Sequence, residues 1–150
     1  MNSSTASAEL AFRLIVPQQT IVPLVASLYY SSEDPYAIRV AFHVGLDEPV
    51  EWIFARDLLA NGIKGRDGLG DVRVWPGPAT AGRGVAAELV AGGEQVLHIE
   101  LSSPFGEAHF EAAIREVSDF LRRTYRIVPT GEEGGFVDVE AELANLLRQG

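Results

Sequence analysis

The sequence contains no cysteine, three histidines and one methionine among its 150 residues. Without cysteine the chain has no disulfide, no thiolate nucleophile and no zinc ribbon. Three histidines leave little material for a transition-metal cluster. These absences exclude several classes of enzyme and of metal-dependent domain.

Positive charge is also scarce. The chain has 12 Lys and Arg residues compared with 21 Asp and Glu residues, and Lys64 is its only lysine. The resulting net charge of −9 repels the phosphate backbone of nucleic acids and the headgroups of anionic lipids. The charge therefore disfavours a nucleic-acid partner, and we expect contact with a membrane only through another protein.

The sequence shows neither a secretory signal nor a membrane-spanning run. Residues 1–8 form a polar stretch without a basic or an apolar region, and we expect a disordered tail there. The apolar residues 21–28 are interrupted by Pro23 and Ser27, and they fall short of the roughly 20 residues that span a bilayer. We expect a cytoplasmic protein with a single domain over residues 9–150.

Hydrophobic residues nevertheless make up 47% of the chain, and the mean hydropathy is +0.08. These values are high for so acidic a protein and permit an apolar surface that serves self-association. We therefore expect a homo-oligomer, whose closed symmetry would hide strand edges and aromatic surface together.

Alternation of hydrophobic and polar residues predicts strands at residues 9–16, 22–30, 36–44 and 49–54. A short helix over residues 55–61 follows, and we expect Gly62 to end it as a left-handed C′ residue. After a glycine-rich loop, the sequence predicts a strand at residues 72–75 and a hairpin formed by residues 84–90 and 95–101. This order indicates an α+β fold with mainly antiparallel sheets.

The clearest predicted helix begins after Ser103, a suitable N-cap, with Pro104 in its first turn. Hydrophobic residues then recur at helical spacing: Phe110, Ala113, Ile114, Val117, Leu121, Thr124 and Tyr125. The stripe is too apolar to remain in water, so we expect this helix to pack on a sheet. A last amphipathic helix is predicted over residues 138–148.

No motif assembles a reaction centre. The glycines around Lys64 do not have the spacing of a phosphate-binding loop, and no serine lies in a nucleophile motif. His98 and Glu100 share one face of a predicted strand, whereas His109 falls in the first turns of the predicted helix. We interpret both histidines as surface or structural residues. The sequence therefore predicts no enzyme, no catalytic residue, no cofactor and no metal.

The aromatic and arginine residues leave an alternative function open. Trp52 and Trp75 could stack nucleic-acid bases, although tryptophans in strands more often serve packing. Arg122 and Arg123 lie on the long predicted helix, where interleaved acidic residues favour ion pairs over phosphate binding. A single-stranded nucleic-acid-binding protein that uses these residues is the alternative.

Five sequence blocks carry a family resemblance. They are DPYAIR at residues 34–39, leading to FH at 42–43; VEWIFARDLL at 50–59; GDVRVWP at 70–76; LSSP at 101–104; and FLRRT at 120–124. In content and order these blocks resemble the SsgA-like sporulation and cell-division proteins of actinobacteria. The resemblance covers residues 9–147, and the predicted hairpin over residues 84–95 is longer than the family's pattern.

The resemblance implies a non-enzymatic regulator that marks septum sites and recruits the tubulin-like division protein FtsZ during sporulation-specific septation. It also implies an SsgA-type partner protein, a homotrimer and a location at the septum. The implied fold is similar to that of the whirly proteins, with two strand-strand-helix modules. The lysine-rich nucleic-acid motif of the whirly proteins has no counterpart here.

We take six residues of these blocks as candidates for partner binding: Arg56, Asp57, Arg73, Trp75, Arg122 and Arg123. On the short helix, Phe54, Leu58 and Leu59 are predicted to face inward, which leaves Arg56 and Asp57 facing outward. An internal ion pair or a helix cap is the alternative role for these two charged residues, because surface charges are often merely structural.

Overall fold

The computed structural model describes residues 4–45, 47–81, 94–104 and 106–136. In these residues, eight strands form one antiparallel sheet in the order β4-β3-β2-β1-β8-β7-β6-β5. The strands are β1 (Thr5–Val16), β2 (Thr20–Ser31), β3 (Asp34–His43), β4 (Val50–Ala55), β5 (Asp67–Leu69), β6 (Val72–Pro78), β7 (Gln95–Ser103) and β8 (Gly106–Ala113). The helices are α1 (Arg56–Lys64) and α2 (Ile114–Ile127), with short 3-10 segments η1 (Pro17–Gln19) and η3 (Glu133–Phe136). The predicted α+β class is confirmed.

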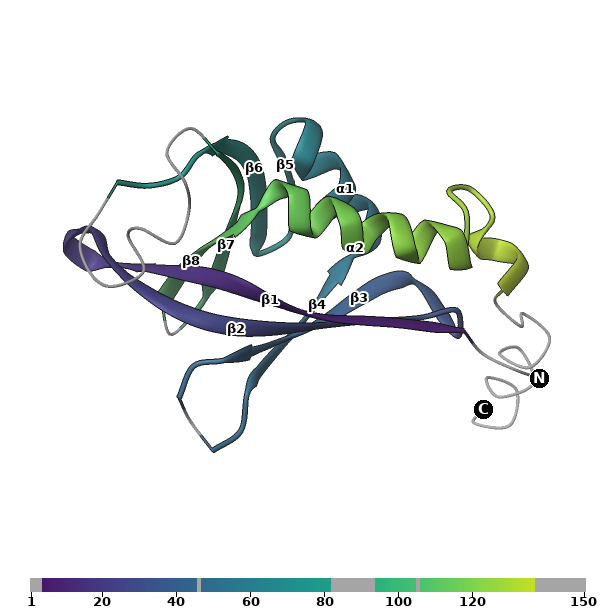
Figure 1. Ribbon diagram of the computed structural model, residues 1–150, viewed down its shortest axis with the longest axis horizontal. Helices are drawn as coiled ribbons and strands as arrows, with labels where there is room; N and C mark the ends of the chain where they lie inside the picture. The colour runs from purple at the N-terminus through teal and green to yellow at the C-terminus, as the bar shows by residue number, and fades with distance from the viewer. Residues whose placement is uncertain (1–3, 46, 82–93, 105, 137–150) are drawn as a thin grey trace.

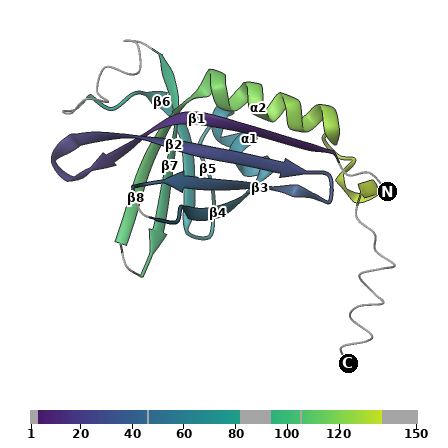
Figure 2. The same cartoon turned by 60° about the horizontal axis from the view of Figure 1, so that its bottom comes forward.

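The chain builds the sheet in two halves, each a four-stranded meander followed by a helix. Strand β1 joins the halves by pairing with β8, from Phe12 opposite Ala112 to Ile15 opposite His109. The strands of the second half cross those of the first steeply (Figure 2). Helix α2 lies lengthwise along the sheet with α1 beside it (Figure 1). The similarity to the whirly fold stays a prediction.

The core lies between the two helices and the inner face of the sheet. Alternate residues of the central strands are buried there, including Phe12 of β1 and Phe42 of β3, and the ring of Phe42 stacks on that of Phe110 with centroids 4.3 Å apart. Helix α2 contributes Val117 and Leu121 to the same cluster and contacts β1, β7 and β8. The predicted packing of the long helix on the sheet is confirmed.

Helix α1 continues past Gly62, which the sequence analysis placed at its end. Gly62 is buried against β6, where an added Cβ atom would lie 2.5 Å from Cγ2 of Val74. A side chain at this position would collide with the strand, so glycine allows α1 to approach β6 closely. The helix ends at Lys64, and the predicted termination at Gly62 was wrong.

The long helix is shorter than predicted, because residues 106–113 form β8. Phe110 and Ala112 face the core and alternate with His109 and Glu111, so the segment has a period of two as well as helical spacing. This segment pairs with both β1 and β7, which satisfies its backbone hydrogen-bonding groups. The pairing therefore favours a strand over the predicted helix.

Ser103 therefore does not cap a helix. Its hydroxyl group donates a hydrogen bond to the carbonyl oxygen of Gly106, at 3.2 Å, in the turn between β7 and β8. Helix α2 begins at Ile114, after Ala113, which makes no side-chain cap hydrogen bond.

The ends of the chain differ from the sequence analysis in part. Strand β1 begins at Thr5, so residues 5–8 belong to the sheet rather than to a disordered tail. The strand predicted at residues 84–90 and the helix predicted at residues 138–148 lie outside the described residues. Among the described helices, neither is long and apolar enough to cross a bilayer.

Leu121→Ala should destabilise the protein by about 2–5 kcal/mol, because it opens a cavity between α2 and the sheet. The neighbouring Arg122 is exposed, so Arg122→Ala should change the free energy of unfolding by no more than about 0.5 kcal/mol. Urea denaturation of both variants measures the difference. Equal unfolding midpoints would show that the buried face of α2 is wrongly assigned.

Candidate interaction surface

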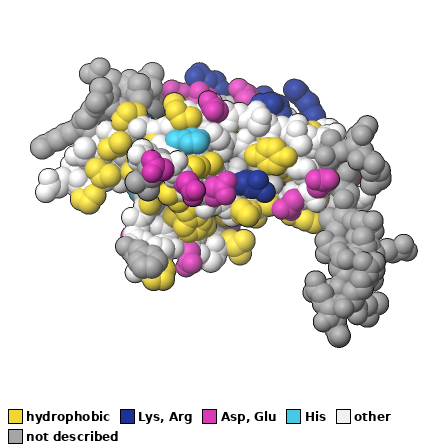
Figure 3. Space-filling model, turned by 90° about the horizontal axis from the view of Figure 1, so that it is seen from below, with side chains coloured by type: hydrophobic (Ala, Val, Ile, Leu, Met, Phe, Trp, Pro, Cys, Tyr) yellow, Lys and Arg dark blue, Asp and Glu magenta, His cyan; other side chains and the backbone are white. Residues whose placement is uncertain are grey.

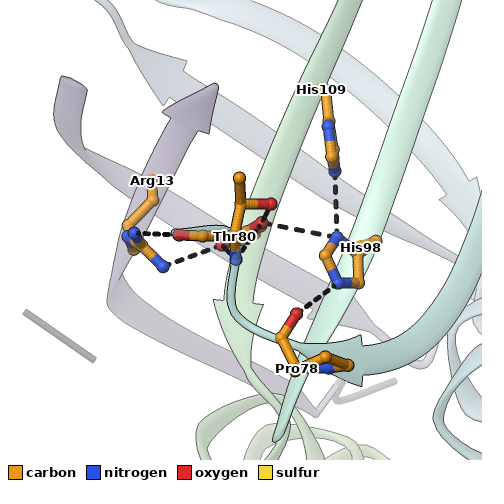
Figure 4. Close-up of polar contacts among 6 residues, drawn as sticks. Arg13, Pro78, Thr80, His98 and His109 are labelled. Atoms are coloured by element: carbon orange, nitrogen blue, oxygen red, sulfur yellow. Dashed lines mark hydrogen bonds and ion pairs between the residues drawn. The ribbon is translucent and has the colours of Figure 1, made fainter. Parts of the chain in front are cut away.

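A row of polar and aromatic side chains crosses the outer face of the sheet, opposite the helices. In register, Arg13 of β1 lies opposite Glu111 of β8, Glu111 opposite His98 of β7, and His98 opposite Trp75 of β6. Paired residues of neighbouring strands share a face of a sheet, and these four alternate with core residues. We call them the Arg13–Trp75 row, and Figure 4 shows the part around His98.

The row is organised by a buried ion pair. Arg13 and Glu111 are 2% and 0% exposed, and Nη1 of Arg13 donates to Oε1 of Glu111 at 2.8 Å. Nη2 of Arg13 donates to the carbonyl oxygen of Thr80 at 3.0 Å. The backbone N–H and the hydroxyl group of Thr80 both donate to Oε2 of Glu111. These bonds compensate for removing the charges from water, and they tie the segment after β6 across the row.

His98 and His109 extend this network. Nδ1 of His98 lies 2.9 Å from Nε2 of His109, and Nε2 of His98 lies 3.0 Å from the carbonyl oxygen of Pro78 (Figure 4). Burial and the adjacent His98 hold the pKa of His109 below its ordinary value of 6.5, although Glu111 and Glu100 act in the opposite direction. His98 is the structural histidine that was predicted, whereas His109 lies in β8 and not in a helix.

The accessible part of this face surrounds Trp75. The half-buried Trp75 ring stacks on the His98 ring with centroids 5.1 Å apart and planes 4° apart. The guanidinium of Arg66 lies 5.3 Å from the centre of the Trp75 ring, and Arg73 forms an ion pair with Glu100. The structure thus brings the candidates Arg73 and Trp75 together. Arg66 was missed because its contact depends on how β5 folds back on β6.

Arg56 is buried, with 1% of its surface exposed, so the prediction that it faces outward was wrong. Nη1 donates to the carbonyl oxygens of Thr124 and Val128 at the C-terminal end of α2, at 3.2 and 2.8 Å. Nη2 donates to Oε2 of Glu133 at 2.9 Å. The alternative role, an internal ion pair, is therefore the correct one. A cation is favoured here because the C-terminus of a helix carries partial negative charge.

Two tyrosine rings enclose the Arg56 guanidinium. Their centres lie 5.0 Å from it for Tyr30 and 4.2 Å for Tyr125. Burial raises the pKa of Tyr30 to about 12, against the opposing charge of Arg56. The backbone amide of Glu133 and the hydrogen bond from Arg56 lower the pKa of Glu133. At pH 7 Arg56 and Glu133 therefore form an ion pair without net charge, enclosed by the two tyrosine rings.

Three further candidates are exposed but lie on the helices. Asp57 is exposed in the first turn of α1, beside Leu58, which is buried as predicted. On α2, Arg122 pairs with Asp119 at 2.8 Å, and the Arg123 guanidinium lies 5.8 Å from the centre of the Phe120 ring. The six candidates are thus distributed over separate parts of the molecule.

The residues of the nucleic-acid alternative are not brought together either. Trp52 packs against the core and stacks on Phe54, with ring centroids 6.4 Å apart. Trp75 lies on the opposite face of the sheet, since it alternates with the buried Val74. The two tryptophans therefore provide no common stacking platform.

The first half of the sheet carries an apolar surface that the sequence analysis did not identify. Val25 and Tyr29 of β2 are 44% and 41% exposed on the outer face of the sheet, and Ile53 of β4 is 64% exposed there. Arg39 lies between Tyr29 and Ile53 in register, with its guanidinium 5.6 Å from the centre of the Tyr29 ring. A space-filling view shows hydrophobic side chains interspersed with acidic ones (Figure 3). This surface could have been identified in the sequence, because Ile and Val occur there at strand positions that alternate with core residues.

Comparison with known proteins gives matches along almost the whole chain. The family model described as Streptomyces sporulation and cell division protein, SsgA, matches residues 24–133. The chain is 51% identical over 149 residues to the sporulation-specific cell division protein SsgB of Thermobifida fusca (strain YX), covering 98% of this chain and 99% of the relative. It is 43% identical over 147 residues to SsgB of Streptomyces coelicolor, covering 98% of each chain.

Solved structures agree with the sequence matches. The crystal structure of an SsgA-like sporulation-specific cell division protein from Thermobifida fusca YX-ER1 superposes with a TM-score of 0.80 at 50% identity, over 95% of this chain and 96% of that one. A structure from work on SsgB mutations and longitudinal cell division in Streptomyces coelicolor superposes with a TM-score of 0.77 at 45% identity, over 89% and 96% of the two chains.

Glu111→Gln should cost about 3–5 kcal/mol in the free energy of unfolding, because it leaves Arg13 as an uncompensated buried charge. Glu100→Gln removes an ion pair whose arginine is 57% exposed, so it should cost no more than about 1 kcal/mol. Urea denaturation at pH 7 compares the two. A loss of similar size in both variants would contradict the structural role of the Arg13–Glu111 pair.

Proposed function

The chain belongs to the SsgA family of sporulation and cell division proteins, and we propose that it marks septum sites and recruits FtsZ during sporulation-specific septation. The family resemblance found in the sequence is thus confirmed. The observation that carries the proposal is the similarity to SsgB proteins over nearly the full length of both chains. The protein acts in sporulation cell division, and recruitment is the step we assign to it.

The hydrogen bonds of the Arg13–Trp75 row favour a binding role without catalysis. In the described part of the chain, both carboxylate oxygens of Glu111 are held by Arg13 and Thr80. Both ring nitrogens of His98 lie within hydrogen-bond distance of a partner. Side chains whose hydrogen-bonding groups are satisfied within the fold hold the surrounding surface in position. We therefore infer that this protein works by forming a complex with a partner.

We place the contact with FtsZ, or with an SsgA-type partner protein, around Arg73 and Trp75. Arginine and tryptophan are the residue types that most often anchor protein interfaces. Arg66 lies beside them, so two arginines, of which Arg73 is paired with Glu100, adjoin the Trp75 ring on a protein of net charge −9. Asp57, Arg122 and Arg123 are accessible secondary candidates, and Arg56 is withdrawn because it is buried.

We also propose that the protein is a homotrimer at the cytoplasmic side of the septum. The exposed Val25, Tyr29 and Ile53 support this proposal, because apolar residues without cover are the type that homo-oligomer interfaces bury. Strand β4 lies at an edge of the sheet, so its backbone groups are also available to a second copy.

Co-sedimentation with purified FtsZ polymers tests recruitment. The wild-type chain should appear in the polymer pellet, and Arg73→Glu should weaken binding at least about tenfold through slower, salt-dependent association. The double variant Arg73→Glu with Glu100→Arg restores an ion pair of reversed orientation, so it separates loss of recognition from loss of the pair. Absence of the wild-type chain from the pellet would overturn recruitment. Equal binding of all three chains would remove this surface from the proposal.

Light scattering tests the oligomeric state. The wild-type chain should show about three times the monomer mass of 16.2 kDa. Ile53→Glu should lower that mass, because a buried charge would disrupt an apolar interface. Leu69→Glu is a matched control, since Leu69 of the far edge strand is also 64% exposed. A monomer at micromolar concentration would contradict the trimer.

A further inference from the structure

The geometry points to a binding site for one Zn²⁺ ion formed by His98, His109 and Glu111 on the outer face of β7 and β8. One ligand atom from each residue lies within 4.8 Å of the other two. Two imidazole nitrogens and a carboxylate oxygen are ligands that Zn²⁺ accepts. The sequence analysis predicted no metal, because it placed His109 in a helix and apart from His98.

The strand register brings the three ligands together. His98 lies directly opposite Glu111, and His109 precedes Glu111 by two residues on the same face of β8. Nδ1 of His98 is 3.4 Å from Oε2 of Glu111 and 2.9 Å from Nε2 of His109. Ligand atoms around a tetrahedral Zn²⁺ ion are about 3.3 Å apart, given bonds of about 2.0–2.1 Å. The first distance already suits the ion, and the second must open by a few tenths of an ångström.

Neighbouring groups hold the ligands in the required states. The carbonyl oxygen of Pro78 can only accept, so the proton of His98 lies on Nε2 and the lone pair of Nδ1 faces His109 (Figure 4). Oε1 of Glu111 accepts from Arg13, which orients the carboxylate. Oε2, the ligand atom, accepts from the backbone N–H and the hydroxyl group of Thr80, so binding the ion requires the Thr80 hydroxyl group to turn away. The Trp75 ring stacks on His98 and restricts its rotation. Outer partners of this kind orient the ligands of known metal sites.

Charge and access limit the affinity. The Arg13 guanidinium repels a cation, whereas Glu100 lies opposite His109 in register and adds a second carboxylate near the site. His98 and Glu111 are buried, and the half-buried His109 provides the approach from solvent. Binding Zn²⁺ replaces the bond between the histidines and moves the proton of His109 from Nε2 to Nδ1. We expect weaker binding than at a site with thiolate ligands.

Isothermal titration of the untagged full chain with ZnCl₂ tests the site directly. The wild-type chain should bind one ion per chain. His109→Ala and His98→Gln should each weaken binding at least about 100-fold. His43→Gln is the matched control, because His43 is the third histidine and lies in β3, bonded to Ser27. Circular dichroism checks that each variant is folded.

Tryptophan fluorescence provides a second measurement that leaves all three ligands intact. The chain has two tryptophans, and Cu²⁺ bound beside His98 should quench Trp75. Quenching at one equivalent of Cu²⁺ should therefore occur in Trp52→Phe and be lost in Trp75→Phe. Failure of the wild-type chain to bind one ion, unchanged binding in His109→Ala, or equal quenching in the two tryptophan variants would overturn the site. Because no FtsZ is present, these outcomes are independent of the proposed recruitment.

Discussion

The sheet is continuous only because β1 pairs with β8, and the buried ion pair between Arg13 and Glu111 lies within that short junction. A shift of β1 by one residue against β8 would move Arg13 into the hydrophobic core and leave Glu111 unpaired on the outer face. The pair therefore specifies one alignment of the two halves of the sheet. The position of His98 and Trp75 relative to β1 depends on that alignment.

A second buried arginine performs a similar task on the helical side. Arg13 donates to the carbonyl oxygen of Thr80, and Arg56 donates to those of Thr124 and Val128. In both places a guanidinium links its own element to backbone carbonyl groups far away in the sequence, through bonds that a hydrophobic side chain cannot supply. The fold thus uses its few internal charges to fix connections, while hydrophobic packing holds the layers together.

Local patterns in the sequence were sufficient for much of the fold. The meander from β1 to β4 and helix α1 follow from alternation and turn residues. Residues 106–113 were misassigned because Phe110 fits a period of two and a helical stripe equally well, and pairing with β1 and β7 decides between them. The burial of Arg56 depends on Glu133, 77 residues away, and is invisible to any local pattern. The candidate site was predictable only as single residues, since its geometry arises from the register of four strands.

The junction between β1 and β8 also affects how the protein is made. Arg13 and Glu111 are 98 residues apart, so at about 5–20 residues per second β1 waits on the order of 5–20 s for its second neighbour to leave the ribosome. During that time β1 is the open edge of a growing meander, and open edges pair with other chains. Glu9 and Arg13 place opposite charges along this edge. Parallel in-register pairing of two nascent chains would set Glu9 against Glu9 and Arg13 against Arg13, so we expect these charges to discourage that arrangement until β8 arrives.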